Sequence, residues 1–189
     1  MSLMYWFKEK IVRFFAKITI YKYPSFIMFG STSYKMKGED VRDVINILQP
    51  GDILLRRYDH FLTGLMIPGY FTHAAIYQGN NQVIHMLGDG IEKQDILTFC
   101  RCDSVAIIHC NDEQITKRAR KMARDLLAQN VKYDYAFNFS DKTRFSCTEL
   151  INLVYDSPMI PRKNKNYITP DDFLSIDKSL FEITYRKGH

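Results

Sequence analysis

The stretch from residue 72 to residue 86 constrains the fold most strongly. Two runs with an apolar, strand-like character, residues 72–77 and 82–86, flank the triplet Gly79-Asn80-Asn81. Glycine and asparagine readily adopt the positive φ angles that a tight hairpin turn requires. The sequence therefore predicts two antiparallel strands joined by a short turn.

Other elements follow from periodicity and turn residues. Residues 52–57 and 103–110 resemble strands, and residues 41–48 resemble a short helix closed by Pro50-Gly51. The clearest helix lies within residues 112–130, where apolar side chains recur on one stripe and Lys/Arg fills the other face. Strands clustered before and after helices, without strict alternation, predict an α+β fold.

The positive charge is concentrated at one end of the chain. The protein has 189 residues and a formal charge of +5, but residues 1–37 contain seven Lys/Arg and one Glu, a net +6. The remaining 19 basic and 20 acidic residues give −1. We therefore divide the chain into a basic, aromatic arm (1–37) and one domain (38–189), and a nucleic-acid-binding core is not expected.

The arm has the period of an amphipathic helix. Its apolar residues recur every three or four positions: Met4, Phe7, Ile11, Phe14, Phe15 and Ile18. Two readings remain open: a helix lying in a membrane surface, or a helix packed on its own domain. No run reaches the roughly 18 apolar residues that span a bilayer, and a secretory signal also fits poorly. A cytoplasmic or peripheral membrane location is expected.

The cysteines do not form a recognisable disulfide framework. Cys100, Cys102, His109 and Cys110 are close in sequence, but their spacing matches no standard zinc pattern. Buried free thiols are the expected state, and no metal or cofactor is predicted.

Cys147 lies in a different context. Ser146 and Glu149 form an S-x-x-E capping box before the apolar run 150–154, so Cys147 is predicted to be the first residue of a helix. Unpaired amides and the helix dipole at that position favour the thiolate, which is the nucleophilic form of cysteine. The alternative is a buried cysteine at a helix start.

A thiolate nucleophile needs an imidazole base, and the base needs an orienting partner. His73 and His85 are each six residues from Gly79, so a hairpin centred there places them directly opposite one another. A register slip of one residue would separate them onto opposite faces. His60 and His189 have no comparable context.

These motifs together resemble the permuted NlpC-type, papain-like hydrolases, a group that includes YiiX/YebB-like and lecithin:retinol acyltransferase-like proteins. The resemblance covers roughly residues 48–175, with the histidines preceding the cysteine. It is carried by Pro50-Gly51-Asp52, Thr72-His73-Ala74-Ala75, Val83-Ile84-His85, Tyr133-Asp134-Tyr135, Phe145-Ser146-Cys147-Thr148-Glu149 and Ile168-Thr169-Pro170-Asp171-Asp172-Phe173.

The resemblance implies a small antiparallel sheet packed on helices. It also implies Cys147 as nucleophile, His73 as general base and then acid, and His85 as the residue that orients His73. Tyr133 would line the site and contact substrate. Thr148 stands where many relatives have Ser.

The implied chemistry is acyl transfer through a Cys147 thioester. The substrate would be an amide or ester, either a lipid-linked or membrane-proximal compound or a cell-wall peptide. Two other classes stay open: a non-catalytic binding module of the same fold, and a protein that docks a partner through the arm. No oligomeric state follows from the sequence.

Overall fold

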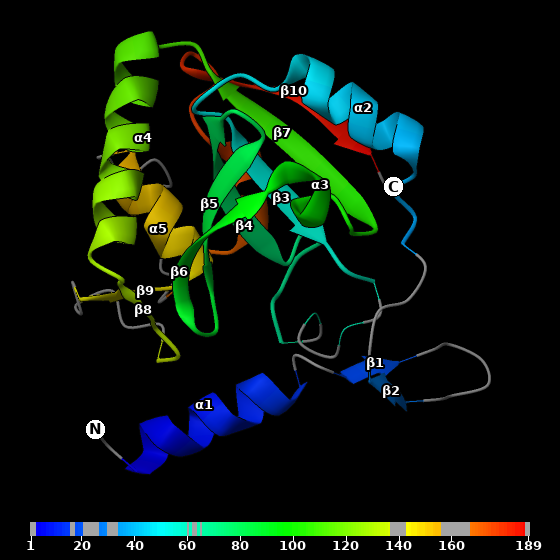
Figure 1. Cartoon of the computed structure of the whole chain (residues 1–189), viewed down its shortest axis with the longest axis vertical. Helices are drawn as coiled ribbons and strands as arrows, with labels where there is room; N and C mark the ends of the chain where they lie inside the picture. Colours follow the sequence, from blue (N-terminus) through cyan, green and yellow to red (C-terminus); the bar gives the residue numbers. More distant parts are fainter. Residues whose placement is uncertain are drawn as a thin grey trace.

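The computed structural model describes residues 3–15, 18–20, 27–29, 34–59, 61, 64, 66–136, 143–155 and 167–187. Its centre is a six-stranded antiparallel sheet in the order β10-β7-β3-β4-β5-β6 (Figure 1). The strands are β3 (Ile53–Arg57), β4 (His73–Gly79), β5 (Gln82–Leu87), β6 (Gly90–Asp95), β7 (Ser104–Cys110) and β10 (Phe181–Lys187).

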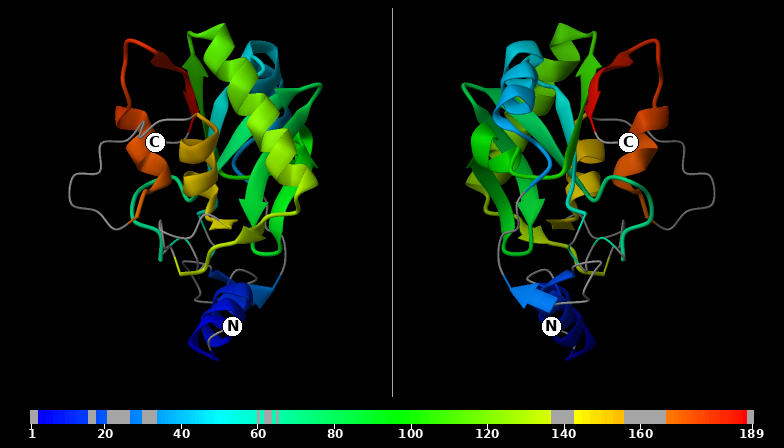
Figure 2. Two further views of the ribbon diagram at one scale, coloured as in Figure 1. Left: turned by 90° about the vertical axis from the view of Figure 1, so that its left-hand side faces the viewer. Right: turned by 90° about the vertical axis from the view of Figure 1, so that its right-hand side faces the viewer.

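Helices cover both faces of this sheet (Figure 2). Helices α4 (Glu113–Ala128) and α5 (Cys147–Val154) pack on the face that carries Leu55 and Ile76. Helices α2 (Gly38–Ile47) and α3 (Ile96–Phe99) cover the face of Leu54. Successive strand residues point to opposite faces, and both faces of the central strands are buried. The sequences of these strands are therefore almost continuously apolar.

The α+β fold class is confirmed, and the predicted helices and central strands are present. The sequence reading missed several elements at the edges: β6, β10, α3, the 3-10 helix η2 (Pro170–Ser175), and the parallel pair β8 (Lys132–Tyr133) and β9 (Arg144–Phe145). Strand β10 does alternate apolar and polar side chains, with Phe181, Ile183 and Tyr185 at every second position, so the sequence contained a signal for this edge strand.

The β4–β5 hairpin forms, but its predicted register is wrong. Asn80 and Asn81 both adopt positive φ angles, 51° and 57°, as a tight turn requires. An irregularity between Tyr77 and Gly79 then pairs His85 with Ala75 rather than with His73. The offset is two residues, so the two histidines remain on the same face as diagonal neighbours.

The Pro50-Gly51-Asp52 motif has a structural role at the start of β3. Gly51 has a φ of +104°, and a Cβ there would lie 2.5 Å from Cβ of Thr116 on α4. The carboxylate of Asp52 accepts a hydrogen bond from the backbone N–H of Gln49 (2.7 Å) and lies 2.7 Å from Nδ1 of His109. Gly51 therefore allows the start of β3 to lie close against α4, while Asp52 joins this turn to β7 through His109.

The arm contains more than the predicted helix. Helix α1 (Leu3–Phe15) is followed by the short antiparallel strands β1 (Ile18–Ile20) and β2 (Ile27–Phe29), so Ile18 lies in a strand and not on the helical stripe. Arg13 of α1 forms an ion pair with Asp89 in the β5–β6 turn. In the described part of the chain, no helix is both long and apolar enough to cross a bilayer.

Candidate active site

The predicted capping box is present at the start of α5. The Ser146 hydroxyl accepts a hydrogen bond from the Glu149 backbone N–H (3.3 Å), and the Ser146 N–H donates to the Glu149 carboxylate (2.6 Å). Cys147 is therefore the first helical residue. The Glu149 side chain therefore has a structural role in the helix cap.

Cys147 is almost completely buried, with an exposure of 6%. The backbone amides of Ala74, Thr148 and Cys147 itself hydrogen-bond the thiolate and lower the thiol pKa, but burial outweighs them and raises the pKa to about 11. The amides thus act in the predicted direction, but the burial of the sulfur has the larger effect. In the resting protein at neutral pH, Cys147 is a neutral thiol.

His73 and His85 form a direct pair. Nε2 of His73 lies 2.8 Å from Nδ1 of His85, and the ring centroids are 5.0 Å apart. Burial lowers the pKa of both imidazoles, and the positive charge of Arg56 lowers both further. The two rings are therefore neutral at neutral pH, and one can accept a proton from a reacting group.

Arg56 lies directly across from His73 on the neighbouring strand β3. Its guanidinium is buried and stacks on the rings of Phe99 and Tyr58, at 4.4 Å and 5.0 Å from their centroids. Sequence reasoning missed this residue, because an arginine in a strand is usually solvent-exposed. Its effect is to disfavour protonation of the histidine pair.

Cys147 lies beside the beginning of β4, the strand whose first residue is His73. Ala74, whose amide hydrogen-bonds the Cys147 thiolate, directly follows His73 in the strand, and α5 packs on β4. The structure thus places Cys147 next to the residue that follows His73, and it pairs His73 with His85. Residues His60 and His189 lie outside the described residues.

Tyr133 lies in the same region. Burial raises its pKa well above the usual value, and the negative charge of a Cys147 thiolate raises it further. Its ring packs against that of Tyr135, with centroids 4.8 Å apart. The placement fits a residue lining the site, and its contact with substrate stays a prediction.

The other sequence candidates lie apart from this cluster. His109 is paired with Asp52, while Cys100 and Cys102 are buried free thiols whose pKa values burial raises to about 12. Within the described ranges, no group of three or more His, Cys, Asp or Glu side chains could hold a metal ion.

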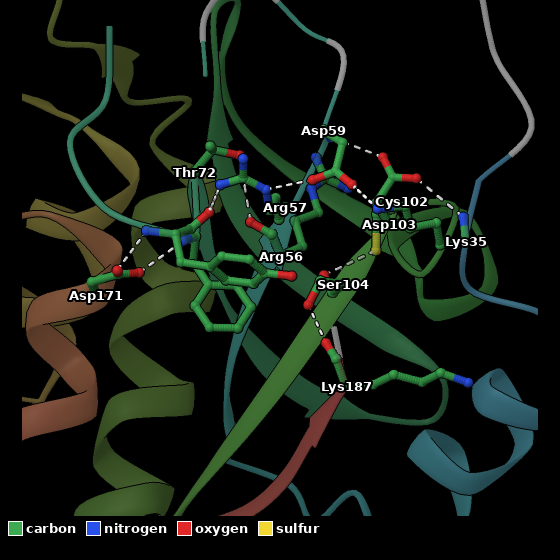
Figure 3. A network of polar contacts seen from close by, with 12 residues as sticks. Lys35, Arg56, Arg57, Asp59, Thr72, Cys102, Asp103, Ser104, Asp171 and Lys187 are labelled. Carbon is green, nitrogen blue, oxygen red and sulfur yellow. Dashed lines mark hydrogen bonds and ion pairs between the residues drawn. The ribbon is translucent and has the colours of Figure 1, made fainter. Parts of the chain in front are cut away.

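Asp171 holds the segment that leads into His73 (Figure 3). Its carboxylate accepts hydrogen bonds from the backbone N–H groups of Tyr70 (2.5 Å) and Phe71 (2.7 Å). From the other side, Arg57 donates to the Tyr70 carbonyl oxygen and to Asp59. The tail motif contained Asp171, but only the fold shows that it anchors the strand carrying His73.

Residues 47–187 match the family of permuted papain-like amidase enzymes, the YaeF/YiiX or C92 family. The match spans most of the chain, so the protein belongs to this family, and the resemblance noted in the sequence is confirmed. The chain is therefore a cysteine hydrolase of the papain-like amidase class, and the permuted papain-like fold is the family's fold. No curated protein and no solved structure matched the chain.

The Asp171 anchor gives a first prediction. Asp171→Ala leaves two backbone N–H groups without their charged acceptor, and we expect it to lower the free energy of unfolding by roughly 2 kcal/mol and to reduce activity. Urea denaturation measures the stability change. Asp177→Ala is the matched control, because Asp177 also accepts a backbone N–H, from Ser179, but at an exposed position. Equal effects of the two substitutions would contradict the anchoring role.

Proposed function

We propose that the protein cleaves an amide or ester bond through a thioester on Cys147, with His73 as general base and His85 as its orienting partner. One observation carries the proposal: the Cys147 sulfur is hydrogen-bonded by the residue next to His73, and His73 is already paired with His85. Since Nε2 of His73 is occupied by His85, Nδ1 is the nitrogen that receives the proton of Cys147.

The mechanism starts from neutral groups. As the Cys147 sulfur attacks the carbonyl carbon, His73 takes the thiol proton, and the carbonyl oxygen becomes an oxyanion. The backbone N–H of Cys147 and the start of α5 supply donors for that oxyanion, worth about 3–4 kcal/mol. His73 then protonates the leaving amine or alcohol, leaving a thioester. Water or another acceptor, deprotonated by His73, releases the acyl group and restores the thiol.

The acyl-enzyme is directly observable. After incubation of the full chain with an activated acyl ester, we expect an acyl mass adduct on the peptide that contains Cys147. Cys147→Ala should abolish the adduct and lower turnover by more than about 10³-fold, since the thioester cannot form without the thiol. Cys110→Ala is the matched control. An adduct on another residue, or activity in Cys147→Ala, would refute the proposed nucleophile.

The pH profile distinguishes a neutral pair from a preformed ion pair. Burial and the charge of Arg56 lower the pKa of His73 well below the ordinary imidazole pKa of 6.5. His73 therefore binds a proton only in the acid range. We therefore expect kcat/KM to decrease only at acid pH and to stay level from about pH 7 to about pH 9. A bell-shaped profile with a decrease above neutral pH would indicate a thiolate–imidazolium pair instead.

Helix α1 supports a membrane-proximal or lipid-linked substrate. Several of its apolar side chains are exposed, among them Met4 by 67%, Phe7 by 59% and Phe14 by 56%. Lys8 and Lys10 are exposed beside them, and Lys10 lies 5.8 Å from the Trp6 ring. An apolar face flanked by cations suits an anionic lipid surface. We propose that the arm (1–37) docks the catalytic domain (38–189) to such a surface; the family match begins after the arm.

Vesicle flotation tests the docking. The full chain should be retained by vesicles containing phosphatidylserine, and Phe7→Glu should weaken retention at least about fivefold, because it places a negative charge on the lipid-facing stripe. Leu97→Glu on α3, at a position with 56% exposure, is the matched control. Equal retention of both variants would remove the membrane role. Faster turnover of an acyl ester on vesicles would favour a lipid substrate, and cleavage of soluble muropeptides would favour the cell-wall alternative.

A further inference from the structure

Glu92 extends the histidine pair to a third strand. It lies on β6 directly opposite His85, and its Oε1 is 3.4 Å from Nε2 of His85, a buried nitrogen that has no closer hydrogen-bond partner among the described residues. The order His73, His85, Glu92 therefore crosses three neighbouring strands, β4, β5 and β6. We propose that Glu92 is a positioning residue that fixes the tautomers of both histidines; the proposal rests on the function assigned to Cys147 and His73.

The inference follows from donor and acceptor roles. An ionised carboxylate only accepts hydrogen bonds, so the His85 nitrogen that faces Glu92 carries the proton. Nδ1 of His85 then has a lone pair and accepts from Nε2–H of His73. This leaves Nδ1 of His73 unprotonated, which is the form that a general base needs. Without Glu92, the opposite tautomer of His85 would put the proton on the wrong nitrogen of His73.

Neighbouring groups keep the Glu92 carboxylate ionised and hold its Oε1 toward His85. Its pKa is lowered, first by the interaction with His85, so it is ionised at neutral pH. Nε2 of Gln94 donates to the same Oε1 at 3.4 Å, and Arg56 reaches Gln94 Oε1 at 3.5 Å. The charged and titratable groups that act on His85 and Glu92 are His73, Arg56 and Asp89.

Replacing Glu92 with a smaller residue creates no cavity in the hydrophobic core. Its side chain is 43% exposed on β6, an edge strand of the six-stranded sheet, whereas His85 is fully buried. Lys93 follows it, is exposed, and points to the opposite face of the same strand. Lys93→Ala is therefore a control for any general effect of changing this strand.

The test combines kinetics with a direct reading of the tautomer in the full chain. We expect Glu92→Ala to lower kcat at least about tenfold with little change in KM, and Lys93→Ala to leave both unchanged. Glu92→Gln retains an oxygen that accepts the same hydrogen, and should recover most of the lost kcat. In ¹⁵N NMR spectra of the imidazoles, Nδ1 of His73 should be unprotonated in the wild type and partly protonated in Glu92→Ala.

Two results would overturn the inference: an unchanged kcat in Glu92→Ala, or a reduced kcat with the wild-type tautomers retained. The second result would show that Glu92 supports the strand only. These outcomes are separable from failure of the proposed function. If Cys147→Ala remained active, the assigned nucleophile would be wrong, while the NMR spectra would still report whether Glu92 sets the histidine tautomers.

Discussion

Burial of Cys147 and the histidine pair is the constraint on which the candidate site depends. Helices cover both faces of the sheet, so Cys147 and His85 are withdrawn from water, and Arg56 is buried beside the histidines. Loss of solvation disfavours every charged form, which raises the pKa of Cys147 to about 11 and lowers that of His73. Cys147 and both imidazoles are therefore neutral at neutral pH. In the proposed mechanism, charge develops only when the substrate is attacked, beside the backbone amides that already surround the Cys147 sulfur.

The same sheet that buries these groups also orders them. Antiparallel pairing sets His73, His85 and Glu92 on adjacent strands and one face, with Arg56 across from His73. A one-residue change in register would turn an imidazole to the other face, whereas the observed two-residue offset does not. The backbone ladder thus determines which side chains become neighbours. Asp171 contributes by fixing the chain just before His73 enters this ladder.

Features that depend on interactions between residues close in the sequence could be predicted from the sequence. The capping box around Cys147 and the Asn80-Asn81 turn depend on side chains within a few residues, and both formed as expected. The register did not follow from sequence, because the irregularity before Gly79 forms within a packed environment: Gly79 lies against Pro50, and Arg120 of α4 donates to the Gln78 carbonyl oxygen. Likewise, the pKa of Cys147 could not be predicted from the sequence, because it depends on burial by segments that are distant in the chain. The roles of Arg56, Glu92 and Asp171 required the assembled sheet.

The arm and the candidate site are linked through the turn between β5 and β6. Arg13 of α1 donates to the Gly88 carbonyl oxygen (3.2 Å), and the Tyr135 hydroxyl donates to the same oxygen. The Tyr135 ring in turn contacts Tyr133, the residue placed near Cys147. A short series of contacts therefore runs from the basic helix to Tyr133, whose pKa responds to Cys147. In the proposed docking, an arm seated on a lipid surface would hold this end of the sheet close to that surface. The +6 charge of residues 1–37 would then decide where the substrate is met, while the chemistry would depend on the near-neutral domain.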